Sequence, residues 1–94
     1  MTPGYEVPLS GAIQELLFRL LKKADADGRR FEFLAAFKAV AQRLCTEPET
    51  FGEEVFDLAA LHLTIKVGVI LPLVVEFGVH SEKRLVIIRT FRYV

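Results

Sequence analysis

The sequence predicts an α+β fold in which helices cover one face of a twisted antiparallel sheet. Residues 13–24 and 33–44 place apolar side chains at helical spacing. Three later segments alternate as strands do, at 61–69, 73–79 and 84–94. A short run before the helices, YEVPLS at 5–10, fits one further strand. We therefore expect an N-terminal strand, two helices and a three-stranded meander in a single domain over residues 1–94.

The first helix has a clear start and one continuous apolar stripe. Ser10 is suited to cap its first turn, because its hydroxyl can accept from free backbone amides. The stripe consists of Ile13, Leu16, Leu17, Leu20, Leu21 and Ala24. Phe18 lies off the centre of this stripe and is expected to be partly exposed. Gly28 is suited to the left-handed turn that ends a helix.

The second helix follows after a short connection, which predicts an antiparallel helical hairpin. Its stripe consists of Phe33, Leu34, Phe37, Val40, Ala41 and Leu44. Residues 46–52 contain Pro48 and Gly52 and are expected to form a loop. The sequence pattern of residues 53–60 is compatible with either a short helical turn or the beginning of a strand.

The strand pattern is regular in the first two segments and ambiguous in the last. In 61–69 the apolar side chains Leu61, Leu63, Ile65, Val67 and Val69 share one face, and His62, Thr64, Lys66 and Gly68 share the other. HSEK at 80–83 is expected to be a hairpin turn. Residues 84–94 carry apolar side chains on both faces, so the pattern does not decide which face is buried. The second apolar set would be covered by loops, by a partner protein or by a second copy of the chain.

Charge and composition exclude several classes of function. The net charge is zero, with −3 over residues 1–57 and +3 over residues 58–94. This contrast is modest, and the chain lacks the strong basic excess of a dedicated nucleic-acid binder. One cysteine and two distant histidines do not have metal-ligand spacing, and the glycines form no phosphate loop, so we expect neither a metal nor another cofactor.

The same composition bears on where the protein resides. Cys45, the single cysteine, cannot form an internal disulfide; we expect a buried thiol, which fits a reducing cytoplasm. The N-terminus has no signal-peptide pattern, and the apolar run at 67–75 is too short for a membrane helix. We therefore expect a cytoplasmic protein with no membrane partner.

A few polar residues are candidates for chemistry. Lys66, Glu76 and Arg89 are expected to meet on the polar face of adjacent strands, either as a cross-strand ion-pair ladder or as a charged active-site remnant. His62 shares that face with Lys66 and is a candidate general base. His80 falls in a turn, where a solvated side chain is expected.

The order of elements and three stretches of sequence resemble the RelE/ParE toxin superfamily of bacterial toxin–antitoxin modules. YEVPLSGAIQELL resembles the opening strand and first helix, and FLAAFKAVAQRLCTEPETFGEEV the second helix and its following loop. The stretch from Leu61 to Val94 resembles the closing meander. The resemblance implies a helical hairpin on one face of a twisted sheet. It also implies a toxin that acts on RNA at the ribosome or on gyrase and is neutralised by an antitoxin segment.

The resemblance carries over to few site residues. Arg92 and Tyr93 match the terminal arginine and tyrosine of the family, and Thr64 and Lys66 occupy the positions of a basic pair. Pro72 and Leu73 stand where the family has a phosphate-binding arginine, which speaks against mRNA cleavage. If the chain is an enzyme, the resemblance implies a metal-independent endoribonuclease.

Two functions follow as hypotheses. In the first, the chain is a toxin-like protein with Arg92, Tyr93 and His62 as catalytic residues and with Lys66, Arg89 and Arg92 as nucleic-acid contacts. In the second, it is a non-catalytic protein-interaction domain of the same fold, for which a homodimer through the exposed apolar edge of the sheet is one arrangement. The fold alone does not decide between them.

Overall fold

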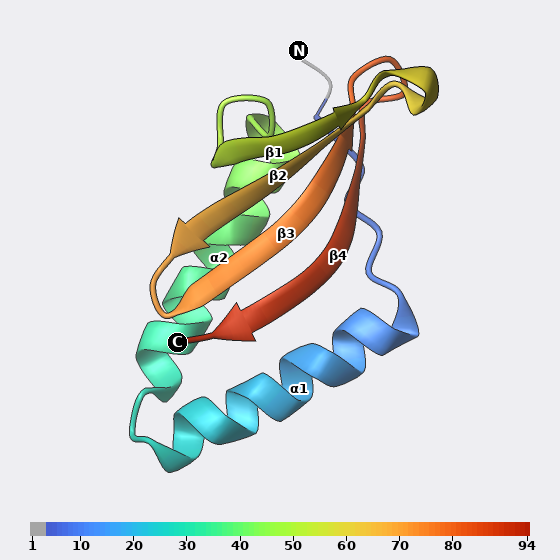
Figure 1. Cartoon of the computed structure of the whole chain (residues 1–94). Coiled ribbons are helices and arrows are strands. Elements are labelled where there is room, and N and C mark those ends of the chain that lie inside the picture. Colours follow the sequence, from blue (N-terminus) through green and yellow to red (C-terminus); the bar gives the residue numbers. More distant parts are fainter. Residues whose placement is uncertain (1–3) are drawn as a thin grey trace.

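The computed structural model describes residues 4–94 and consists of two helices followed by a four-stranded antiparallel sheet (Figure 1). The helices are α1 (Gly11–Ala26) and α2 (Arg30–Thr46). The strands are β1 (Glu53–Leu58), β2 (Leu63–Ile70), β3 (Leu73–His80) and β4 (Leu85–Tyr93), with a short 3-10 turn, η1 (Ala59–Leu61), between β1 and β2. The strands pair in the order β1-β2-β3-β4. The predicted α+β class and the three-stranded meander at the end of the chain are therefore confirmed.

The N-terminal strand predicted at 5–10 is wrong. Only Glu6 of this segment pairs with the sheet, in a single parallel bridge to Leu85, the first residue of β4. The Glu6 amide donates to Arg84 O at 2.9 Å, and its carbonyl accepts from Val86 N at 2.8 Å. The ladder cannot continue through Pro8, which has no N–H to donate. The fourth strand is instead β1, which lies within residues 53–60, the segment whose sequence pattern did not distinguish a helical turn from a strand.

The two helices begin as expected and then separate. Ser10 Oγ accepts from the Ile13 amide at 3.2 Å, so the predicted cap of α1 is present. Gly28, at φ 72°, makes the left-handed turn to α2. From this turn α2 crosses one face of the sheet while α1 lies along β4, and the helices diverge (Figure 1). The predicted hairpin is therefore open along much of its length.

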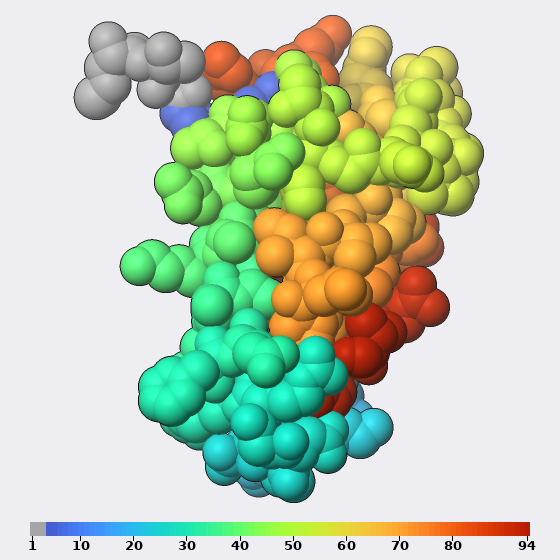
Figure 2. All heavy atoms as spheres, turned by 90° about the vertical axis from the view of Figure 1, so that its left-hand side faces the viewer, coloured from blue at the N-terminus to red at the C-terminus, as the bar shows by residue number. Residues whose placement is uncertain are grey.

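The core lies between α2 and the sheet. Figure 2 shows α2 from the side, next to the β2–β3 hairpin. Phe77 and Phe91 are fully buried in this layer with Val40 and Leu44 of α2. The ring of Phe51, from the loop after α2, stacks on Phe77 with the ring centroids 5.7 Å apart. Within residues 4–94, no helix has the length and apolar character needed to span a membrane.

A β-bulge decides which face of β4 is buried. Glu76 pairs with Thr90 and Phe77 pairs with Ile88, so Arg89 is one extra residue in β4. A bulge of this kind shifts the alternation of side chains by one position. Ile88 before the bulge and Phe91 after it are therefore both buried. Simple alternation, as assumed from the sequence, places these two residues on opposite faces.

The alternation of β2 is as predicted, but its polar side faces the helices. Lys66 pairs with Phe77 and Gly68 pairs with Val75, and paired residues point to the same face of a sheet. Gly68 is required there, because a Cβ atom would lie 2.5 Å from the ring of Phe51. The apolar side of β2, which includes Ile65, therefore faces away from the helices.

Candidate functional site

Two of the predicted catalytic residues, Arg92 and Tyr93, point to opposite faces of β4, as neighbouring strand residues do. Tyr93 lies on the helix side, where its hydroxyl donates to Asp27 Oδ2 at 2.8 Å. The Arg29 guanidinium lies 5.4 Å from the centre of its ring. Burial, followed by the hydrogen bond to Asp27, raises the pKa of Tyr93. Tyr93 thus fastens the end of β4 to the turn between the helices.

The third predicted catalytic residue, His62, lies at the other end of the sheet. It follows η1 in a left-handed conformation, with Nδ1 3.6 Å from Glu82 Oε1. Leu63 next to it pairs with His80, whereas Tyr93 pairs with Leu73. The length of β3 separates these pairs, a distance of about 23 Å at the usual rise of a strand. The structure therefore does not bring His62 together with Arg92 and Tyr93.

Lys66, a predicted nucleic-acid contact, is buried, with 6% of its surface exposed. Its ammonium donates to Pro48 O at 3.3 Å and to Glu49 O at 2.5 Å, both in the loop after α2. Burial lowers the pKa of Lys66. The side chain thus holds the loop on the sheet and is not free to contact a phosphate.

Only one pair of the predicted polar cluster forms. Arg89 Nε lies 3.7 Å from Glu76 Oε2 on the face of the sheet that points away from α2. Lys66 lies on the other face and does not join them. A half-exposed ion pair at this distance contributes little to stability.

The face of β1–β4 that points away from α2 is largely apolar; we call it the open sheet face. A hollow on it is lined by Phe56, Leu58, Leu63, Ile65, Gly78, Ile87 and Arg89. Phe56 is 44% exposed and Ile87 is 43% exposed. The regular alternation of β2 signals one apolar face, but it does not tell whether the helices or another molecule cover that face.

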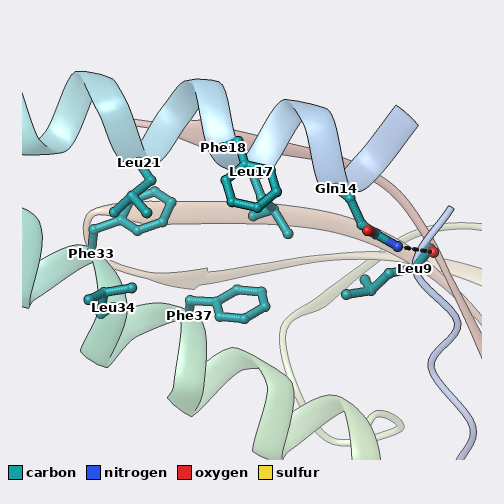
Figure 3. Close-up of a pocket in the computed structure, with 8 residues that line it drawn as sticks. All are labelled: Leu9, Gln14, Leu17, Phe18, Leu21, Phe33, Leu34 and Phe37. Atoms are coloured by element: carbon teal, nitrogen blue, oxygen red, sulfur yellow. Dashed lines mark hydrogen bonds between the residues drawn. The ribbon is translucent and has the colours of Figure 1, made fainter. Parts of the chain in front are cut away.

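A second apolar surface lies where the helices diverge; we call it the interhelical groove (Figure 3). It is lined by Leu9, Gln14, Leu17, Phe18, Leu21, Phe33, Leu34 and Phe37. Phe18 is 65% exposed, which confirms the expectation of partial exposure, and Leu34 is 39% exposed. Gln14 is the only polar side chain in the lining, and its Nε2 donates to Leu9 O at 3.0 Å. The groove was not predicted, because the sequence indicated two helices in contact along their length.

The single cysteine is not part of either surface. Cys45 is exposed near the end of α2, so the prediction of a buried thiol is wrong. Its carbonyl accepts from the Tyr5 amide at 2.8 Å, which ties the N-terminal segment to α2.

Comparisons with protein-family models, with curated proteins and with solved structures found no match to this chain.

Proposed function

We propose that the chain is a non-catalytic protein-interaction domain, which binds an apolar-faced helix of a partner protein in the interhelical groove. The observation that carries this proposal is the lining of the groove. Seven of its eight side chains are apolar, and Phe18 and Leu34 remain substantially exposed within residues 4–94. Exposed apolar side chains gathered on one surface are typical of protein-binding sites.

The chemistry of the groove favours a helix over an extended peptide. An extended peptide brings backbone N–H and C=O groups that need partners when they are buried. The groove offers few such partners, since the amide of Gln14 already donates to Leu9 O. A helix satisfies its backbone internally and contributes only apolar side chains, which is how amphipathic helices bind in grooves.

The positions of the polar candidates support an interaction domain rather than a nuclease. Metal-independent catalysis requires a base and charged donors within hydrogen-bond reach of one reacting group. His62 and Tyr93 lie at opposite ends of the sheet, and Lys66 is bound to loop carbonyls. The described residues therefore do not assemble the predicted catalytic set.

Photo-crosslinking in the cells that produce the protein tests the groove. The photoreactive p-benzoyl-phenylalanine replaces Phe18 in the groove or, as a matched control, Phe31, which is 86% exposed on α2 and does not line the groove. We expect position 18 to yield one discrete cross-linked protein and position 31 to yield none. Leu34→Glu across the groove is expected to abolish the product. Equal products from both positions, or a product that survives Leu34→Glu, would contradict the proposal.

A toxin-like protein, held inactive by an antitoxin, is the second candidate. The observation that favours it is the order of two helices followed by an antiparallel meander, as the resemblance implies. In that function the helix bound in the groove would belong to the antitoxin. Expression of the chain alone separates the two candidates, because only a toxin is expected to arrest growth. Relief of the arrest by Arg92→Ala with Tyr93→Phe would assign the activity to the C-terminal residues.

A further inference from the structure

We propose that a second copy of this chain covers the open sheet face, in a twofold dimer whose axis runs parallel to the strands between β2 and β3. This inference concerns a different surface from the interhelical groove and does not depend on the function proposed for that groove. It rests on the distribution of charge across the open sheet face, on its apolar rows and on its area.

The open sheet face is acidic at one edge and basic at the other. We call a set of residues that pair side by side across the four strands a row. One such row runs from Glu53 of β1 to Thr90 of β4, through Val67 of β2 and Glu76 of β3. Arg89 precedes Thr90, and Arg92 lies in the next row on the same face. Among residues 4–94, Glu53 and Arg92 form no ion pair with each other or with a third residue.

A twofold axis parallel to the strands matches these edges. It turns β1 of one copy over β4 of the other and leaves each row in its place. Glu53 of one copy then faces Thr90 of the second copy, between Arg89 and Arg92. An axis across the strands would instead place β1 on β1 and β4 on β4, so Glu53 would have no arginine of the second copy opposite it. Charge complementarity therefore selects the first axis.

The apolar rows match under the same axis. Phe56 and Ile87 lie at opposite ends of one row, and Leu58 and Leu85 lie at opposite ends of the next. The axis sets Phe56 against Ile87 of the second copy and Leu58 against Leu85. Packed sheets keep their strands within about 30° of each other, which is compatible with an axis that runs parallel to the strands.

The size of the face fits a dimer of modest affinity. Four strands about 4.8 Å apart, with lengths of six to nine residues at about 3.3 Å per residue, cover about 500 Å² in each copy. Two such faces bury about 1,000 Å², at the lower limit of specific interfaces. The charge on the face sums to zero, with Glu53 and Glu76 against Arg89 and Arg92, which gives a nucleic acid no net attraction.

Sedimentation equilibrium of the purified full chain tests the dimer. We expect the average mass to rise from one chain toward two over about 1–100 μM, the range of small transient interfaces. Ile87→Glu places a charge in the apolar centre of the face and is expected to yield one chain throughout. Phe31→Glu, on α2, is the matched control and is expected to behave as the original chain.

A charge reversal tests the geometry. Glu53→Arg and Arg92→Glu are each expected to weaken the dimer about tenfold, because each sets like charges together twice. The double variant restores opposite charges and is expected to regain the original dissociation constant.

The side chains of Glu53, Ile87 and Arg92 are exposed, and far-UV circular dichroism verifies that each variant is folded. A monomer at 100 μM, a dimer unaffected by Ile87→Glu, or a double variant as weak as the single variants would overturn the proposal. Cross-linking at position 18 is expected to persist in Ile87→Glu. The proposed helix binding in the interhelical groove and the proposed dimer are therefore tested independently of each other.

Discussion

Phe77→Ala is expected to lower the free energy of unfolding by about 3–5 kcal/mol, the usual cost of removing a buried phenylalanine. The Phe77 ring is fully buried in the centre of the sheet and stacks on Phe51. Small domains have only about 5–15 kcal/mol of stability in total, so this variant should unfold at much lower urea concentration. Urea titration followed by circular dichroism measures the change.

Phe31→Ala is the matched control for Phe77→Ala. The Phe31 side chain is 86% exposed, and surface substitutions usually change stability by less than about 0.5 kcal/mol. The same loss of stability in both variants would show that Phe77 is not at the centre of the core. The stacking of Phe51 on the sheet would then be wrong as well.

Gly52→Ala is expected to cost about 2–5 kcal/mol, from a strained backbone and a steric overlap. Gly52 has φ 78°, a conformation that residues with a Cβ atom rarely adopt. A Cβ atom there would also overlap the backbone carbonyl of Val67 in β2, which cannot move without breaking the sheet. The variant should therefore lift the loop after α2 away from β2.

Gly28→Ala separates the two causes. Gly28 has a similar φ of 72°, but no atom lies within 4 Å of the position of its Cβ. Only the backbone strain of about 1–2 kcal/mol applies. Urea titrations of both variants measure the difference, which equals the cost of the overlap with Val67. Equal losses in the two variants would contradict the close approach of the loop to β2.

Local signals in the sequence predicted much of the fold. The hydroxyl of Ser10, the spacing of the helical stripes and the alternation in β2 and β3 each act over a few residues, so they can be read without the structure. The residues from Leu63 onward form the predicted meander. The run at 5–10 also has a strand pattern, but Pro8 limits it to a single bridge.

Long-range contacts decided what the sequence could not predict. The extra residue at Arg89 is specified by pairing with β3, and its effect is that Ile88 and Phe91 are both buried. Lys66 faces the helices because the loop carbonyls of Pro48 and Glu49 accept from its ammonium. No pattern within β2 reports the position of that loop. Lys66, Arg89, Arg92 and Tyr93 lie in the predicted strands, but His62 precedes β2 in a left-handed conformation, and the grouping of these residues in space could not be predicted.

The polar side of β2 faces the helices and its apolar side faces outward. Acetylation of lysines in the folded chain, read by mass spectrometry, tests this orientation of β2. The monomeric variant Ile87→Glu is used so that a second copy cannot protect the open sheet face. We predict that Lys66, which is 6% exposed, reacts far more slowly than the exposed Lys83. Equal reaction of the two lysines would place Lys66 on the solvent side of the sheet and contradict this orientation of β2.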